Sequence, residues 1–430
     1  MIGINRKLAA FQKEGKRIHV GLVGAGQMGR GMVSQIEGMK GMQVSAIADI
    51  NVEAVKSAFK FAGIEENKIT SASSLEEANQ AAENNQVVAT NDYNILTKMD
   101  SIDVIVDATG VPDVGANVAL QSILNKKHIV MLNVETDVTI GPLLYHMATS
   151  ADVVYTGSAG DEPGSIMELY DFADAINFEI VALGKGKNNP LNLEATPDSV
   201  KEIADAKKAN PKMIASFQDG TKTMVEMTAV ANATGFVPDK PGMHGVSGTV
   251  KDLPKLLIPK EDGGIFSQKK VVEFVNGVAP GVFAIITSSS EEVNEELQYL
   301  NLGEGPYYVL YRPYHLASLE TPLSVAKAFF DHEPTIAPMN GMVAETVAVA
   351  KRDLKKGENL DEIGGYTVYG KIYKKEEAEQ LNALPIGLVD HNVVVQKDIK
   401  KGEVITYDAV EQTKTSTIWT LRKLQDQQKY

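Results

Sequence analysis

Short runs of apolar, β-branched residues alternate with amphipathic stretches over the N-terminal part of the chain. Such runs are typical of buried parallel strands, and the stretches between them are typical of helices. The expected strands are Ile18–Val23, Val44–Ala48, Val104–Val106, Ile129–Leu132 and Val153–Tyr155. The expected helices between them are Met28–Glu37, Val52–Phe61, Gly115–Asn125 and Leu143–Thr149. This alternation predicts a doubly wound α/β (Rossmann) domain, interrupted by a polar insert over residues 65–99 that holds a charged helix.

Beyond Gly157 the strands and helices no longer alternate regularly. We expect strands at Glu179–Gly184, Val271–Phe274, Val282–Ile286 and Tyr307–Tyr311, and helices at Ser165–Ala175, Thr223–Thr234 and Thr321–Phe329. The segment GKGKNNP is expected to form a loop after the first of these strands. Mixed elements of this kind predict an α+β domain for substrate binding and dimerisation.

An internal repeat follows: AKRDLKKGE at 350–358 recurs as VQKDIKKGE at 395–403. Each copy places a Lys-Lys-Gly turn between two strand-like runs, which predicts a small β-rich module with its lysine pairs exposed to solvent. The predicted domains are therefore a Rossmann domain over 1–156, an α+β domain over 157–335 and a β-rich domain over 336–430.

Composition narrows the functional classes. The 430 residues include no cysteine, which excludes disulfide scaffolds, iron–sulfur clusters and cysteine nucleophiles. Lysine and arginine number 42 against 56 aspartates and glutamates, so nucleic acid and acidic membrane surfaces are not the expected partners. Neither a membrane-spanning apolar run nor an apolar leader is apparent, and we expect a cytoplasmic protein.

The clearest motif is a glycine-rich turn between the first strand and the first helix of the Rossmann domain. It is the G-x-G-x-x-G formed by Gly24, Ala25, Gly26, Gln27, Met28 and Gly29. Asp49 ends the second strand twenty residues later, so the full context of a dinucleotide-binding fingerprint is present. Gly26 would let the backbone approach the pyrophosphate, which binds at the helix N-terminus. The alternative is a plain glycine-rich turn.

Asp49 also bears on the choice of cofactor. Its carboxylate would bind the adenosine ribose hydroxyls and repel a 2′-phosphate, which favours NAD over NADP. Further cofactor contacts are expected at the ends of later strands of the same sheet, from Ala108, Thr109, Gly110 and Asn133.

Candidate substrate-binding and catalytic residues lie in the second domain. The GKGKNNP segment offers Lys185, Lys187, Asn188 and Asn189 to an anion, the alternative being an exposed basic turn. Asp219 precedes a mostly apolar helix on which Lys222 and Glu226 lie four residues apart. These two side chains form either an acid/base pair or a surface ion pair.

Carboxylates and a histidine complete the candidates. Glu135, Asp137, Asp161 and Glu162 are hard oxygen ligands for Mg²⁺ or Mn²⁺, although such residues more often cap helices and turns. His315 lies in a polar and aromatic cluster and is a catalytic candidate, with a structural role as the alternative.

Over residues 17–330 these segments resemble the homoserine dehydrogenase-like superfamily. GSAGDEPG stands where that family has a Gly-Gly-x-Pro loop, and GKGKNNP stands at its substrate loop. Lys222 and Glu226 fall where the family has its catalytic Asp and Lys, in the reverse order, and NVETD lacks the lysine expected there.

The chain resembles the 1-deoxy-D-xylulose 5-phosphate reductoisomerase-like family more closely, with the repeat standing for a C-terminal SAF domain over 342–430. The resemblance implies a dimeric or larger homo-oligomeric enzyme of isoprenoid biosynthesis. It would reduce, with possible isomerisation, a phosphorylated sugar to a polyol phosphate, using a nicotinamide cofactor and Mg²⁺ or Mn²⁺. It further implies that Lys185, Lys187, Asn188 and Asn189 bind the phosphate and that Glu135, Asp161 and Glu162 bind the metal or the substrate hydroxyls. Lys222 would face the carbonyl oxygen.

The sequence thus predicts an NAD(P)-dependent oxidoreductase acting on a phosphosugar or a hydroxy acid, with Lys222 as the leading acid. One alternative is a homoserine dehydrogenase-like enzyme acting on an amino or hydroxy acid. Another is a protein without catalytic activity that senses nucleotides or binds carbohydrate.

Overall fold

The computed structural model describes residues 3–207 and 209–428, which divide into two compact units. The first unit comprises Met1–Gly164, Leu316–Ala337 and Thr417–Tyr430, and the second comprises Ser165–His315 and Pro338–Ser416. The predicted boundaries near residues 156 and 335 differ from this division, because two later segments return to the first unit.

The first unit is built on a parallel sheet of seven strands within the described residues. Its strands are β1 (Ile18–Val23), β2 (Met42–Ala48), β3 (Ile69–Ser71), β4 (Val87–Thr90), β5 (Val104–Asp107), β6 (His128–Met131) and β7 (Tyr155–Gly157). Their order is β3-β4-β2-β1-β5-β6-β7, so the order in which successive strands are added reverses between β1 and β5, which remain parallel to each other. This arrangement confirms the predicted doubly wound α/β fold, whose ligand crevice lies at such a switch point.

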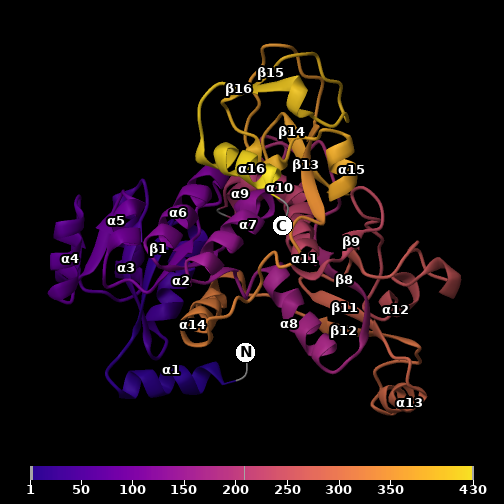
Figure 1. Cartoon of the computed structure of the whole chain (residues 1–430), viewed down its shortest axis with the longest axis horizontal. Coiled ribbons are helices and arrows are strands. Elements are labelled where there is room, and N and C mark those ends of the chain that lie inside the picture. The colour runs from indigo at the N-terminus through magenta and orange to yellow at the C-terminus, as the bar shows by residue number, and fades with distance from the viewer. Residues whose placement is uncertain (1–2, 208, 429–430) are drawn as a thin grey trace. The chain divides into compact units, whose positions relative to one another are not determined.

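Helices cover both faces of this sheet. They are α1 (Ile4–Lys13), α2 (Gln27–Glu37), α3 (Val52–Phe61), α4 (Leu75–Glu83), α5 (Tyr93–Lys98), α6 (Pro112–Leu124), α7 (Val134–Ser150), α14 (Thr321–Asp331) and α16 (Thr417–Gln427). Helix α14 lies beside α1 and α2 (Figure 1), and its Val325 and Ala326 are buried in the core with β1. This burial explains why a segment so late in the chain belongs to the first unit.

Two predictions for the first unit are corrected. The polar insert over 65–99 contributes β3 and β4 to the sheet, because Val88 and Ala89 are fully buried although the segment around them is polar. The predicted helix Leu143–Thr149 is the second half of α7, which already begins at Val134. Pro142 lies inside this helix, and a proline there is usually a break, which concealed the first half.

The C-terminal helix α16 docks at this proline. The side-chain amide of Gln425 accepts a hydrogen bond from the backbone N–H of Leu143 (3.0 Å) and donates one to the carbonyl of Thr139 (3.0 Å). A regular helix would join these two backbone groups directly. The amide therefore inserts into α7 beside Pro142 and satisfies the groups that the interruption separates.

Replacing this amide is expected to destabilise the first unit. Gln425→Leu would leave a buried N–H and a buried carbonyl without this partner, so the free energy of unfolding should fall by about 2–4 kcal/mol. Urea denaturation measures the change. Gln427→Leu, on an exposed position of the same helix, is the matched control and should stay within about 0.5 kcal/mol of the wild type.

The second unit holds a mixed sheet of five strands in the order β12-β11-β8-β10-β9. The strands are β8 (Glu179–Lys187), β9 (Val237–Pro238), β10 (Val271–Asn276), β11 (Val282–Thr287) and β12 (Tyr307–Arg312). The helices of this part of the chain are α8 (Glu162–Ala175), α9 (Lys201–Lys207), α10 (Pro211–Gln218), α11 (Thr221–Thr234), α12 (Leu253–Leu256) and α13 (Glu291–Tyr299). This sheet confirms the predicted α+β second domain.

Side chains alternate across this sheet with the two-residue period of a strand. On one face Leu183 and Phe274 pack with Met227 of α11, whereas on the other face Phe283 and Val275 pack with residues of α12. Each face therefore has its own apolar core, and α11 is buried along nearly its whole length.

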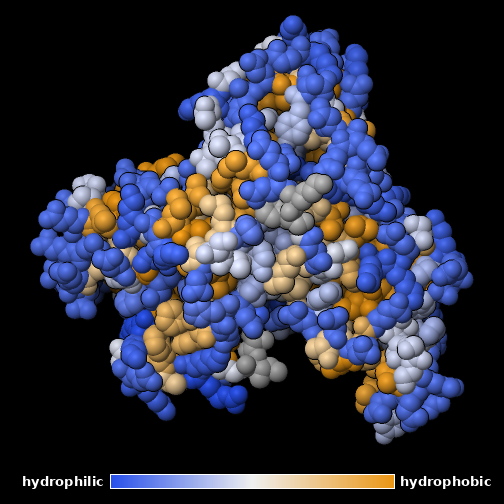
Figure 2. Space-filling view, viewed as in Figure 1, coloured by the Kyte–Doolittle hydropathy of each residue, from blue (hydrophilic) through white to orange (hydrophobic). Residues whose placement is uncertain are grey.

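The C-terminal module of the second unit contains two antiparallel strand pairs and a short helix: β13 (Ala344–Ala350) with β14 (Val368–Lys374), β15 (Val393–Val395) with β16 (Val410–Gln412), and α15 (Lys375–Gln380). The two repeat copies meet reciprocally, because Asp398 accepts from the Lys356 amide (3.0 Å) and Asp353 accepts from the Lys401 amide (2.9 Å). The lysine pairs lie on exposed turns, and the module presents a mostly hydrophilic surface in Figure 2.

Candidate functional site

The glycine-rich turn of the first unit has the geometry of a nucleotide cradle. Gly24 adopts a left-handed conformation (φ +103°), and a Cβ there would lie 2.8 Å from the carbonyl oxygen of Ala108. A Cβ on Gly29 would overlap the carbonyl of Gly24, whereas a Cβ on Gly26 would meet nothing within 4 Å. Contacts within the protein thus require Gly24 and Gly29, whereas Gly26 faces open space at the start of α2. That space is where a dinucleotide pyrophosphate needs close backbone approach.

Asp49 lies beside this turn as predicted. One carboxylate oxygen accepts a hydrogen bond from the Ala25 amide (2.7 Å), and the other accepts from the Asn51 amide (2.9 Å). Ile50, next to it, is 97% exposed. The carboxylate is therefore held beside the glycine-rich turn at the end of β2, and Asp49 is half-buried.

The loop after β5 is held by a buried network. The Asn133 side chain donates to Asp107 (3.1 Å) and to the carbonyl of Val111 (3.0 Å), and Asp107 also accepts from the Thr109 amide (3.0 Å). Burial raises the pKa of Asp107 to about 6. Ala108 and Thr109 are half-buried and Gly110 is exposed at the same edge, whereas Asn133 is fully buried and holds the loop.

The candidate carboxylates divide into two groups. Glu135 and Asp137 belong to the first turn of α7, where negative charge stabilises the helix N-terminus. Asp137 accepts a hydrogen bond from the buried hydroxyl of Tyr155 (2.9 Å), and burial raises its pKa to about 6. Its place is therefore structural.

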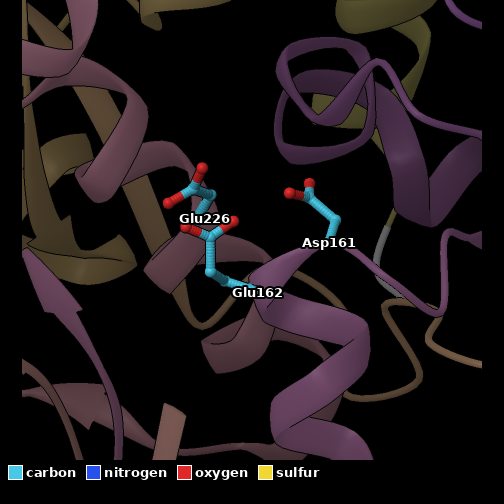
Figure 3. Close-up of side chains that lie close together, drawn as sticks. All are labelled: Asp161, Glu162 and Glu226. Atoms are coloured by element: carbon cyan, nitrogen blue, oxygen red, sulfur yellow. The ribbon is translucent and has the colours of Figure 1, made fainter. Parts of the chain in front are cut away.

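Asp161 and Glu162 stand where the chain enters α8 (Figure 3). Their carboxylates offer oxygens within 4.8 Å of each other. Among the described residues, no group of three potential metal ligands includes Glu135. Asp161 and Glu162 thus fit a divalent cation better than Glu135 does.

The second unit contains a buried cluster of charged side chains, which we call the lysine cluster: Lys185, Lys187, Asp219, Glu226 and Lys351. Lys185 and Lys187 lie within β8, so the predicted loop begins only after them. Being two residues apart, they project from the same face of the strand. Lys185 forms an ion pair with Glu226 of α11, and both side chains are buried. The Lys187 ammonium donates to the carbonyl of Phe217 (2.6 Å).

Burial and the neighbouring Lys185 lower the pKa of Lys187 to about 8, while the carboxylates of Asp219 and Glu226 act in the opposite direction. Burial raises the pKa of Asp219, and Lys351 counteracts that effect. Three lysines and two carboxylates leave this cluster with one net positive charge when all five are ionised. A buried surplus of positive charge suits an anionic ligand.

The remaining candidates of this part of the chain are Lys222, Asn188, Asn189 and His315. Lys222 is half-buried on the first turn of α11, and Asn188 and Asn189 follow β8 directly. His315 is half-buried after β12. Glu226, which the sequence offered as a partner of Lys222, forms an ion pair with Lys185 of β8.

Lys351 is a member that sequence reasoning missed. It pairs with Asp219 at 2.9 Å and its side chain is only 2% exposed. A signal was available, because Lys351 lies in the repeat where the second copy has Gln396. This difference between the two copies was overlooked, because Lys351 is one of many lysines in the repeat and the others lie on exposed turns.

Residues 160–321 match the family model described as "Oxidoreductase DRL, catalytic domain", a span that includes Lys185, Lys187 and α11. No sequence among the curated proteins matches the chain. The match supports the coarser prediction of an oxidoreductase enzyme.

Several solved structures share part of the fold at low similarity. A probable dehydrogenase from Thermotoga maritima is 12% identical, with 76% of this chain and 92% of that chain covered and a TM-score of 0.43. A putative myo-inositol dehydrogenase from Sinorhizobium meliloti 1021 is 13% identical (76% and 93%, TM-score 0.41). Scyllo-inositol dehydrogenase from Lactobacillus casei, solved with NAD(H) and scyllo-inositol, is 12% identical (76% and 93%, TM-score 0.42).

These findings correct the resemblance inferred from the sequence. The matched family model is an oxidoreductase DRL catalytic domain, so the predicted membership in the reductoisomerase-like or homoserine dehydrogenase-like family is wrong. The SAF domain and the place in isoprenoid biosynthesis are likewise unsupported, because they rested on that resemblance alone. Among the helices of the described residues, not one has both the length and the apolar character that a membrane span requires.

Proposed function

We propose that this chain is an NAD(P)-dependent dehydrogenase that acts on a small hydroxylated anion, such as a phosphorylated sugar or a hydroxy acid. The observation that carries the proposal is the open space at Gly26 between two glycines that the fold itself requires. The nicotinamide cofactor, when bound, accepts or supplies the hydride. The match of residues 160–321 to an oxidoreductase catalytic domain supports the same class.

Asp49 supports NAD as the preferred cofactor. A 2′-phosphate would approach a carboxylate whose orientation is fixed by two backbone amides. Since two negative charges repel each other, NADPH should bind more weakly than NADH.

The lysine cluster is proposed to bind the anionic group of the substrate. Lys185 is neutralised by Glu226, whereas Lys187 donates to the uncharged carbonyl of Phe217. Lys187 therefore supplies the surplus positive charge, and Asn188 and Asn189 can add neutral donors beside it.

Lys222 is proposed as the proton donor to the substrate oxygen. It lies in the first turn of α11, the helix that also carries Glu226 of the lysine cluster. Lys222→Met should leave NADH binding unchanged and lower turnover at least about 100-fold, the size of effect that general acids have. Turnover is followed by NADH absorbance against a panel of phosphorylated sugars and hydroxy acids. Unchanged turnover in the variant would remove Lys222 from the reaction.

Anion binding should depend on pH through Lys187. The protonated amine binds an anion and the neutral amine does not, so affinity for inorganic phosphate should fall as pH rises through about 8, where the pKa of this group lies. Lys187→Arg keeps its charge at every accessible pH and should abolish this loss. Calorimetric titrations from pH 6.5 to about 9.5 test it; a flat profile in the wild type would exclude Lys187.

A divalent cation is a further proposal at Asp161 and Glu162, whose oxygens are of the kind that Mg²⁺ and Mn²⁺ prefer. Such an ion would orient and polarise a substrate oxygen. Activity measured before and after treatment with a chelator, followed by addition of Mg²⁺, tests this role.

A further inference from the structure

Lys351 occupies an unusual position for a lysine in a repeat of exposed charges. Its ammonium group donates to Asp219 (2.9 Å), to the carbonyl of Ala195 (2.7 Å) and to the carbonyl of Gly365 (2.8 Å). An ammonium group has three N–H donors, and all three are used. One side chain of the C-terminal module thus joins three separate segments of the second unit.

Asp219 transmits this contact to the candidate site. Its second carboxylate oxygen accepts a hydrogen bond from the Thr221 amide (2.8 Å), which is the first residue of α11. The hydroxyl of Thr221 in turn accepts from the Gly370 amide of β14 (2.8 Å). The start of α11, which carries Lys222, is therefore held by the C-terminal module at two points.

The fold of the repeat does not itself require a lysine here. The equivalent position of the second copy is Gln396, which is half-buried and donates to Glu411 (2.9 Å). The other repeat lysines form exposed pairs, such as Lys400 with Asp353, which contribute little to stability. A buried ammonium costs free energy to desolvate, so its presence at only one copy points to a role outside the repeat.

We propose that Lys351 is a positioning residue of the lysine cluster: it holds the Asp219 carboxylate in place and, through it, the first turn of α11 and the surroundings of Lys187. The inference rests on the proposed function, because it concerns the same anion site. It makes the C-terminal module an integral part of the catalytic unit.

The physical argument follows the charges. Burial favours the protonated form of Asp219, and Lys351 is the largest influence that favours the ionised form. The charged groups that act on Lys187 are Lys185, Asp219 and Glu226. Without the charge of Lys351, the pKa of Asp219 rises further, so its carboxylate favours the protonated form of Lys187 less strongly. The pKa of Lys187 then falls below its already low value.

The experiment measures the pKa of Lys187 in the full chain by NMR of ¹⁵N-labelled lysine side chains, with Lys187→Arg to assign the signal. Lys351→Gln places the residue of the second copy at this position and removes the charge. Asp219→Asn removes the carboxylate. We expect both variants to lower the pKa of Lys187 by at least about 0.5 and to weaken binding of inorganic phosphate at pH 7.5 about threefold or more.

Two variants serve as controls. Lys351→Arg retains the charge, so the pKa of Lys187 should stay near its wild-type value. Lys400→Gln makes the same change at an exposed repeat lysine and should leave the pKa of Lys187 unchanged. Melting temperatures are recorded for every variant. An unchanged Lys187 pKa in both Lys351→Gln and Asp219→Asn, with lower melting temperatures alone, would show that Lys351 is purely structural and overturn the inference.

Failure of the proposed function gives a different result. If the wild type does not bind phosphate but the pKa of Lys187 still falls in both variants, the positioning role stands and the anion site is refuted.

Discussion

Replacing Lys185 with methionine should lower the free energy of unfolding by about 3–5 kcal/mol, because removing one member of a buried ion pair is strongly destabilising. Both side chains are less than a tenth exposed, so solvent cannot compensate for the loss. Urea denaturation followed by circular dichroism measures the change. A loss of less than about 1 kcal/mol, the value typical of surface pairs, would contradict the buried pair.

The double variant Lys185→Met with Glu226→Leu separates stability from function. Replacing a whole buried ion pair by apolar side chains of similar volume is often neutral, so most of the lost stability should return. Anion binding and turnover should not return, because the charged groups are gone. Recovery of activity in the double variant would show that the pair serves the fold alone.

Gly26→Val should abolish cofactor binding while leaving the fold intact. The added side chain enters open space, and the φ of −67° at this residue suits any amino acid. The cost to stability should be at most about 1 kcal/mol, as for a change at a helix N-cap. The same side chain would occupy the space required by the pyrophosphate, so affinity for NADH should fall at least about 100-fold, equivalent to about 2.7 kcal/mol.

Gly38→Val is the matched control at the opposite end of α2. Its Cβ would also lie at ordinary contact distance, with the nearest atom 3.5 Å away. Fluorescence titration with NADH should give wild-type affinity for this control. Equal affinity in Gly26→Val would mean that the open space is not the cofactor site.

Much of the first unit could be predicted because its signals are local. The buried strands are short apolar runs, and the fingerprint from Gly24 to Gly29 with Asp49 lies within one β-α-β unit. Pro142 and the polar composition around β4 obscured two elements, because tertiary contacts such as the inserted amide of Gln425 override local preference. The return of α14 and α16 to the first unit could not be predicted from local patterns.

The candidate site was predictable in its residue types and less so in its pairings. Lys185, Lys187, Asp219 and Glu226 were identified from the sequence, and the structure brings them into one buried cluster with Lys351. The spacing of Lys222 and Glu226 suggested a pair within one helix, and Glu226 also forms an ion pair with Lys185, which lies on a strand 41 residues away in sequence. Periodicity carries no information about such long-range ion pairs.

The most direct test of the central proposal is a fluorescence titration of the wild-type protein with NADH and, separately, with NADPH. The structure predicts saturable binding of NADH and weaker binding of NADPH, because Asp49 is held beside the open space at Gly26. Binding of neither cofactor would contradict the assignment of the glycine-rich turn and, with it, the proposed dehydrogenase activity.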